Sequence, residues 1–239
     1  MPDQRPFHFR HFSMMHCNST MKIGTDSVLL GAWVNVENAT KILDIGTGSG
    51  ILSLMLAQRS NAMNIVGVDI DVLSVNEAKL NFETSQWRKR LKAIHLDIRD
   101  ENSVLHTYDF IISNPPYFTS PFTTRTERRG LARHTDTLSY SELIHCAALR
   151  LDINGIFAVV LPFDQSNNFI EKASQQKLFL KRALQIIPIE GKPPNRINME
   201  FSATNTSNPV VESFIIRTNN GNYTAQYCNM LGEFYLGLT

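Results

Sequence analysis

Apolar and polar positions along the first two thirds of the chain follow two alternating patterns. Short apolar runs that end in polar or glycine residues predict strands, and apolar residues three and four positions apart predict helices. The predicted strands are 41–45, 64–69, 91–96, 108–113 and 155–161. The predicted helices are 28–33, 51–59, 72–83, 138–151 and 168–177. Because strands that alternate with helices are typical of a covered parallel sheet, the pattern indicates an α/β fold.

The last third of the chain has a different pattern. Three strand-like runs, 184–189, 196–202 and 210–217, are joined by turn sequences. We therefore expect a mostly parallel sheet that is closed by an antiparallel hairpin at its C-terminal edge. The whole chain is expected to form a single domain, in which residues 1–20 are an N-terminal arm.

Composition and charge narrow the possible functions. The 23 Lys and Arg residues nearly balance the 22 Asp and Glu residues, and the net charge is +1. This balance excludes a protein that holds nucleic acid by its overall charge, so RNA would have to meet local basic patches. Cys17, Cys146 and Cys228 form no Cys-x-x-Cys pair, so we expect neither a disulfide framework nor a metal site. With no signal peptide or long apolar span, we expect a cytoplasmic protein. We also expect it to be a monomer.

A glycine-rich turn follows the first predicted strand. Gly46, Gly48 and Gly50 alternate with other residues just before the helical pattern begins. Glycines are needed where the backbone turns sharply or approaches a ligand closely. Ile51 stands where a dinucleotide-binding fingerprint would have its third glycine, so that motif is not matched. Taken alone, the turn fits a ligand site and a tight strand-to-helix connection equally well.

Three aspartates accompany the carboxyl ends of the first three strands. They are Asp44, Asp69 and Asp97. Ligands of open α/β sheets bind at this edge, and an acid about 20 residues after the glycine turn is a common partner of ribose hydroxyls. The arrangement resembles the S-adenosylmethionine pocket of class I methyltransferases. This resemblance implies a Rossmann-like α/β fold, with a mostly parallel sheet of seven strands and an antiparallel C-terminal edge strand.

That resemblance implies roles for individual residues. The acid after the second strand would take the ribose hydroxyls, which implies this role for Asp69, and the acid after the third would lie near the adenine amine, which implies it for Asp97. The methionine and ribose would pass the turn made by Asp44, Gly46, Gly48 and Gly50. In amino-methyltransferases a segment before the first strand forms a wall of the pocket, which implies cofactor contacts for Lys22, Thr25 and Asp26. From the residues alone, Thr25 or Asp26 is an N-cap of a packing helix.

Asn114-Pro115-Pro116-Tyr117 is the most specific motif in the chain. It closes the fourth strand at the same edge as the three acids. Two prolines fix the backbone and remove two N–H donors, which leaves an acceptor-rich site. The Asn114 side chain and the Pro115 carbonyl could hold an attacking amine, and Tyr117 offers a ring on which a base stacks. We assign all four residues to the catalytic site, with Asn114 also beside the cofactor. The alternative is a rigid proline turn with a packing tyrosine.

A basic segment follows this motif directly. It spans 119–137 and contains Arg125, Arg129 and Arg133. Such a cluster is either a solvated surface or a set of contacts to RNA phosphates, and we predict phosphate contacts for these three residues and for Arg196.

Together these features resemble the tRNA adenine-N6 methyltransferases that modify adenine 37 of a valine tRNA. The resemblance extends over nearly the full length and implies S-adenosylmethionine as cofactor and tRNA as substrate. The glycine turn is typical of the whole superfamily, and Asn-Pro-Pro-Tyr of its amino-methylating branch. The segments that carry the substrate assignment are 22–33, 132–134, 196–201 and 234–235.

Other functions share part of this pattern. Asn-Pro-Pro-Tyr also occurs in methyltransferases of protein glutamine amides and, in close variants, of amines in ribosomal RNA. A glutamine enzyme would be expected to carry a helical N-terminal domain, whereas here the cofactor elements begin by residue 22. A DNA adenine enzyme would need a target-recognition domain for which the chain has no room. A non-catalytic module that binds cofactor and RNA would have little reason to retain Asn114 and Tyr117.

Overall fold

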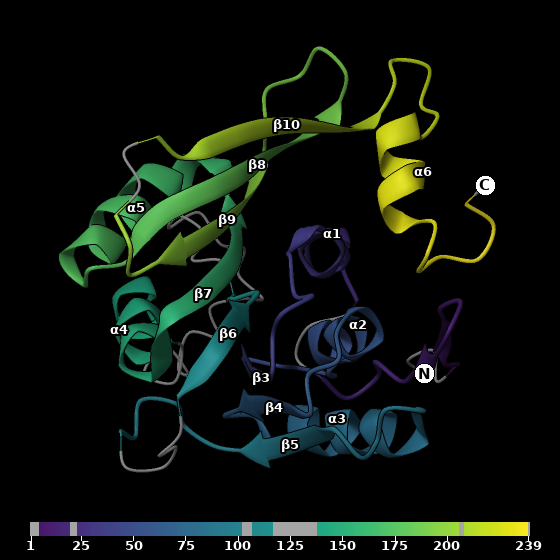
Figure 1. The fold of residues 1–239 in the computed structure, drawn as a ribbon. Coiled ribbons are helices and arrows are strands. Elements are labelled where there is room, and N and C mark those ends of the chain that lie inside the picture. Colours follow the sequence, from purple (N-terminus) through teal and green to yellow (C-terminus); the bar gives the residue numbers. More distant parts are fainter. Residues whose placement is uncertain (1–4, 20–22, 102–106, 117–137, 206–207, 239) are drawn as a thin grey trace, which may run out of the picture.

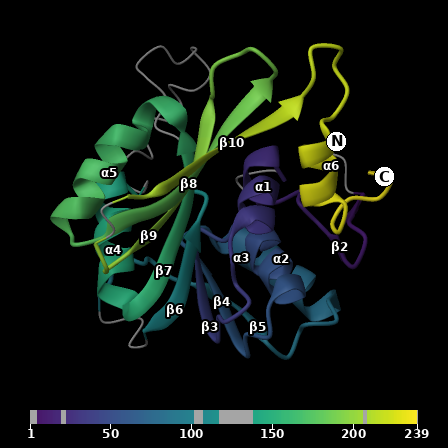
Figure 2. The same cartoon turned by 45° about the horizontal axis from the view of Figure 1, so that its top comes forward.

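The computed structural model describes residues 5–19, 23–101, 107–116, 138–205 and 208–238. Within these residues an eight-stranded sheet has the strand order β10-β8-β9-β7-β6-β3-β4-β5, and helices cover both of its faces (Figure 1, Figure 2). Its strands are β3 (Lys41–Ile45), β4 (Asn64–Asp69), β5 (Leu91–His95), β6 (Tyr108–Ser113), β7 (Leu151–Pro162), β8 (Phe179–Ile189), β9 (Arg196–Ser202) and β10 (Val210–Arg217). The helices are α1 (Thr25–Trp33), α2 (Ile51–Arg59), α3 (Val72–Thr84), α4 (Tyr140–Arg150), α5 (Ser166–Gln175) and α6 (Ala225–Leu231).

Two hydrophobic cores lie on the two faces of the sheet. One core packs α1, α2, α3 and α6 against the sheet, and Leu29, Met55 and Phe82 belong to it. The other packs α4 and α5 and contains Ile144 and Phe169. Strands buried on both faces read as continuous apolar runs, and for this reason the bounds of β3, β4, β5 and β6 could be predicted to within one residue. The strands β7 and β8 begin four and five residues earlier than expected, at Leu151 and Phe179.

The order of the C-terminal strands differs in detail from the prediction. The sheet is mostly parallel and of the expected class, but it has eight strands, and its antiparallel strand β9 lies inside, between β7 and β8. The edge strand β10 pairs parallel with β8. The helix α5 carries the chain from β7 past one strand position to β8, and β9 then folds back by a turn into that position.

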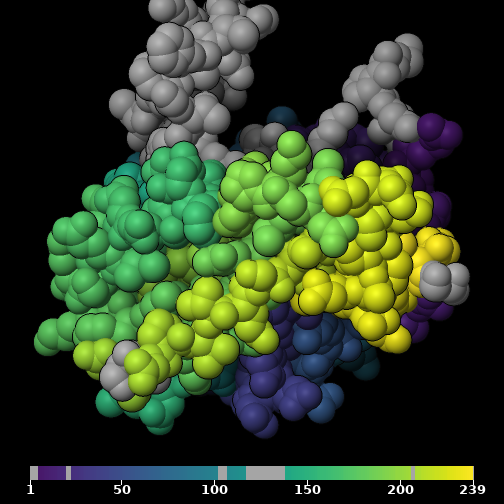
Figure 3. Space-filling view, turned by 90° about the horizontal axis from the view of Figure 1, so that it is seen from above, coloured from purple at the N-terminus to yellow at the C-terminus, as the bar shows by residue number. Residues whose placement is uncertain are grey.

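The two ends of the described chain pack together. Strands β1 (Phe7–His8) and β2 (Ser13–Met14) form a small antiparallel pair. Phe9 is 4% exposed and stacks on Tyr235, with 5.6 Å between the ring centroids. Figure 3 accordingly shows the yellow C-terminal segment beside the purple N-terminal one. Arg10 and His11 are exposed, but Phe9 and Phe12 beside them belong to the core, so residues 5–19 are a packed part of the fold.

None of the helices in the described part of the chain has the length and apolar character needed to span a bilayer.

Candidate active site

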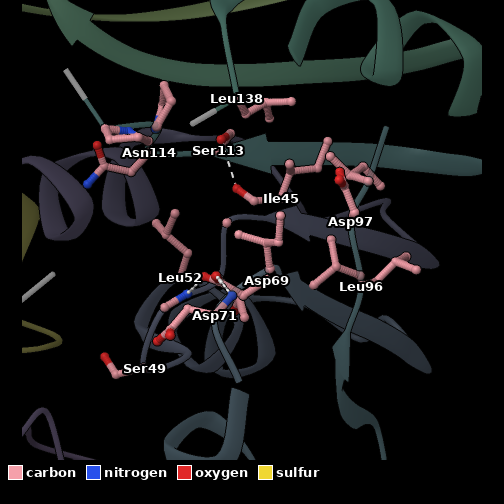
Figure 4. Close-up of a pocket in the computed structure, with 18 of the residues that line it drawn as sticks. Ile45, Ser49, Leu52, Asp69, Asp71, Leu96, Asp97, Ser113, Asn114 and Leu138 are labelled. Atoms are coloured by element: carbon pink, nitrogen blue, oxygen red, sulfur yellow. Dashed lines mark hydrogen bonds between the residues drawn. The ribbon is translucent and has the colours of Figure 1, made fainter. Parts of the chain in front are cut away.

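A cavity of about 700 Å³ opens at the carboxyl ends of β3, β4, β5 and β6. Figure 4 shows Asp69 on one side of this space and Asn114 on the other, with Asp97 at a third side. The four parallel strands end at the same edge of the sheet, which is where open α/β sheets bind ligands. The sequence prediction that their terminal residues meet in one site is therefore confirmed for these three residues.

The glycine turn forms the floor of the cavity at the end of β3. Gly46 and Gly48 line it, with φ of +71° and +56°. A Cβ at either position would meet no atom within 4 Å, so glycine is required there by the backbone conformation and keeps the adjoining space open. The N–H groups of Gly46 and Thr47 donate to the Val68 carbonyl at 2.9 and 3.0 Å, which ties the turn to the end of β4.

Gly50 lies outside the cavity, unlike Gly46 and Gly48. A Cβ at this position would collide with the ring of Phe82 on α3. Gly50 therefore lets the start of α2 pack closely against α3.

Asp44 also lies away from the cavity surface. It is fully buried beneath the glycine turn, where its Oδ2 accepts hydrogen bonds from Thr47 Oγ1 at 2.7 Å and from Ser53 Oγ at 2.8 Å. Burial raises the pKa of Asp44 to about 6, although these hydrogen bonds act in the opposite direction. The structure thus places Asp44 where it holds the turn and the first turn of α2 together, and not where it would touch a ligand in the cavity.

Asp69 lines the cavity with a carboxylate held by the backbone. Its Oδ2 accepts from the Gly48 N–H at 2.9 Å, and its Oδ1 accepts from the Asp71 N–H at 2.9 Å. Burial raises the pKa of Asp69, and the backbone N–H groups partly offset this effect. Each carboxylate oxygen has a second lone pair, so a carboxylate oriented in this way can still accept hydrogen bonds from hydroxyl groups.

Asp97 lines the cavity at the end of β5, together with Arg99. Arg99 Nε donates to Asp97 Oδ1 at 2.8 Å, and Nη2 donates to Oδ2 at 2.7 Å. These hydrogen bonds lower the pKa of Asp97 and keep it ionised. Arg99 was not singled out from the sequence, because an arginine two residues after an acid has no distinctive signal.

Thr25 and Asp26 begin α1 but do not line the cavity. Neither is its N-cap, since Gly24 occupies that position and makes no side-chain cap. Asp26 accepts a hydrogen bond from Arg196 Nε of β9 at 2.9 Å. The structure therefore gives both Asp26 and Arg196 a partner within the chain, where the sequence predicted cofactor and RNA contacts.

Asn114 lines the cavity at the end of β6, beside Pro115 and Pro116. Its Nδ2 donates a hydrogen bond to Ser27 Oγ of α1 at 2.7 Å. Ser27 also lines the cavity. Its position was not predicted, because the preceding Thr25-Asp26 pair is the stronger capping signal in the sequence. Only the packing of α1 against the end of β6 shows that the third residue of this helix faces the motif.

Several predicted residues lie outside the described part of the chain. They are Lys22, Tyr117, Arg125, Arg129 and Arg133. Among the residues that the structure does describe, no group of His, Cys, Asp and Glu side chains could hold a metal ion.

Comparison with known proteins agrees with this geometry. Residues 7–177 match the family model described as methyltransferase small domain. A tRNA1(Val) (adenine(37)-N6)-methyltransferase of Bacteroides fragilis is 40% identical over 233 residues, which cover 96% of this chain and 97% of the relative. The protein of the same name from Yersinia enterocolitica is 39% identical, with 96% and 92% covered.

A crystal structure of a predicted O-methyltransferase from Agrobacterium tumefaciens superposes with a TM-score of 0.67 and 16% identity, covering 87% of this chain and 96% of that one. This likeness concerns the fold, which is that of class I methyltransferases. The identity over the full length with the two curated relatives is much more specific. The chain belongs to the tRNA1(Val) (adenine(37)-N6)-methyltransferase family.

Proposed function

We propose that this chain transfers a methyl group from S-adenosylmethionine to N6 of adenine 37 in tRNA1(Val), the reaction stated in the names of its relatives. The observation that carries the proposal is the position of Asn114. It closes β6 at the cavity that Asp69 lines, so an amine bound there would meet an acceptor and a cofactor site together. The identity of about 40% over almost the whole chain supports the choice of substrate.

The residues of the cavity fit S-adenosylmethionine. The bare backbone of Gly46 and Gly48 leaves room for the methionine and ribose, and the fixed carboxylate of Asp69 suits a pair of ribose hydroxyls. The ionised Asp97 can accept a hydrogen bond from the amine of the cofactor's adenine. Ile70 and Ile98 line the same space and offer apolar surface to a planar base.

The chemistry needs positioning and electrostatics, with no covalent enzyme intermediate. S-adenosylmethionine, when bound, supplies a methyl group activated by its sulfonium. The oxygen of Asn114 and the carbonyl of Pro115 accept the N–H groups of the adenine amine and direct its lone pair. As the nitrogen gains the methyl group it becomes tetrahedral and positively charged, and its N–H bonds polarise, so the two acceptors stabilise the transition state more than the ground state. One of these two protons is then released, which leaves the neutral methylated amine. The base must be unstacked to enter, and Tyr117 is proposed as its stacking partner.

The test is methylation of a tRNA1(Val) transcript by the purified protein, followed by nuclease digestion and mass spectrometry of nucleosides. N6-methyladenosine should form with the wild-type transcript. A transcript in which guanine replaces adenine 37 is the matched control and should give none. Equal methylation of the two transcripts would contradict the assigned position, and no methylation of either would contradict the substrate.

A further inference from the structure

Ser27 contacts the motif that begins at Asn114, although the two residues lie far apart in the sequence. It lies in the first turn of α1, is 7% exposed, and accepts the hydrogen bond from Asn114 Nδ2 at 2.7 Å. The two residues are separated by 87 positions in the chain. Both line the cavity, so this contact lies at the place where the attacking amine is proposed to bind.

This hydrogen bond occupies the donor end of the Asn114 amide. An asparagine amide has a donor end and an acceptor end, which exchange places when the group rotates by half a turn. If an amine approached the donor end, its own N–H groups would face the N–H groups of the amide, and no hydrogen bond could form between them. Because Ser27 Oγ accepts from Nδ2, the opposite end of the amide is the carbonyl oxygen, which is the atom that the proposed mechanism uses.

We propose that Ser27 is a positioning residue for methyl transfer, which holds the Asn114 amide with its oxygen towards the target amine. The inference rests on the proposed function and deepens it by naming a residue that acts through Asn114.

The surroundings of α1 are suited to this role, because contacts at both ends hold the helix in place. At its start, Asp26 is paired with Arg196 of β9 at 2.9 Å. At its end, Arg59 donates to the Val34 carbonyl at 2.6 Å. Arg182 donates to the Trp33 carbonyl at 3.1 Å, and its guanidinium lies 4.1 Å from the centre of the Trp33 ring.

These contacts come from Arg59 of α2, Arg182 of β8 and Arg196 of β9. None of these three arginines lines the cavity. A helix anchored in this way presents the Ser27 hydroxyl at a defined place. Reactions that depend on a near-attack geometry are sensitive to shifts of about 1 Å, so an unanchored amide would lose rate even with the substrate bound.

The experiment compares Ser27→Ala and Ser27→Thr with the wild type in turnover of the tRNA1(Val) transcript. We expect kcat to fall by about tenfold to 100-fold in Ser27→Ala, with KM for tRNA and the dissociation constant of S-adenosylmethionine changed only slightly. Ser27→Thr keeps the hydroxyl and should retain most of kcat. Ser60→Ala is the matched control, because Ser60 is 8% exposed and its hydroxyl bonds to the Leu56 carbonyl at the far end of α2.

The outcomes separate this inference from the function on which it rests. A wild type that makes no N6-methyladenosine contradicts the proposed function itself. An active wild type with an equally active Ser27→Ala overturns only the positioning role. An equal loss of kcat in both Ser27 variants also overturns it, since the volume of the side chain and not its hydroxyl would then matter. A loss confined to cofactor affinity would assign Ser27 to the cofactor instead.

Discussion

The two halves of the sheet contribute to the active site in different ways. In the half formed by β3, β4 and β5, the residues that end each strand line the cavity themselves, as Gly46, Asp69 and Asp97 do. In the half formed by β7, β8, β9 and β10, no strand residue lines the cavity. This half contributes through α1, because Arg196 of β9 and Arg182 of β8 form hydrogen bonds that hold this helix in place.

The difference shows that the site depends on two kinds of residues, those that line the cavity and those that hold the lining residues in place. The first half supplies binding groups from short local segments, whose positions follow from where parallel strands end. The second half supplies support over long distances in sequence, as in the pair of Arg196 with Asp26, which are 170 residues apart. Asn114 lies where the two halves meet, because β6 pairs with β3 on one side and β7 on the other.

The largest effect is expected where the halves meet. Asn114→Ala should lower kcat by about 100-fold to 1,000-fold, because it removes an acceptor that acts mainly in the transition state. Cofactor affinity should remain within severalfold of wild type, since the proposed partner of the amide is the attacking amine. Single-turnover kinetics and calorimetry measure the two quantities. A variant with a near-wild-type rate would contradict the mechanism.

The next effect should be confined to the half of the sheet that supplies the binding groups, formed by β3, β4 and β5. Asp69→Ala removes the two charge-assisted hydrogen bonds that we propose to the ribose, worth about 1.5–3 kcal/mol each, so S-adenosylmethionine affinity should fall by about 100-fold or more. Asp109→Ala is a matched control. Asp109 also accepts backbone N–H groups, from Thr40 at 2.8 Å and Lys41 at 3.1 Å, but at the opposite end of the sheet. Calorimetry that shows the same affinity for a folded Asp69→Ala would remove Asp69 from the cofactor site.

In the half formed by β7, β8, β9 and β10, which supports α1, a substitution should affect stability and leave cofactor affinity intact. Glu200 is 5% exposed at its side chain and pairs with Arg182 at 2.6 Å. Glu200→Gln leaves Arg182 partly buried without its counter-ion and should lower the free energy of unfolding by about 3 kcal/mol, as breaking a buried pair does. The exposed pair of His145 with Glu101 provides the control, since Glu101→Gln should cost under about 1 kcal/mol. Urea unfolding measures both, and an equal effect of the two variants would contradict the comparison.

The smallest effect concerns the buried acid beneath the glycine turn. The pKa of Asp44 is raised from 3.8 to about 6, so the folded protein binds more protons than the unfolded chain between these pH values. The contribution of Asp44 to stability therefore decreases by ~2 kcal/mol as pH rises from about 4 to 6, and it levels off above that range. Asp44→Asn should lack this dependence. The measurement is the difference in unfolding free energy between wild type and variant from pH 4 to 8, and a difference that does not vary with pH would contradict it.

The sequence by itself determined the class of fold, the edge of the sheet at which the site lies, and several of its residues. Buried parallel strands must be nearly continuous apolar runs, and their carboxyl ends must meet at one edge, so Gly46, Asp69, Asp97 and Asn114 could be placed together from their local neighbours alone. The resemblance carried by Asn114-Pro115-Pro116-Tyr117 added the reaction, because that motif is specific to amine methylation.

Only the tertiary structure decided which residues face the cavity and which support it. Asp44 and Gly50 belong to the same local motif as Gly46 and Gly48, yet one is buried beneath the turn and the other packs on Phe82. The direction of a side chain at a turn depends on what packs behind it, and the sequence pattern does not contain this information. Likewise, the partner of Asn114 lies on a helix 87 residues earlier, and a contact over that distance is set by the packing of α1 against the sheet.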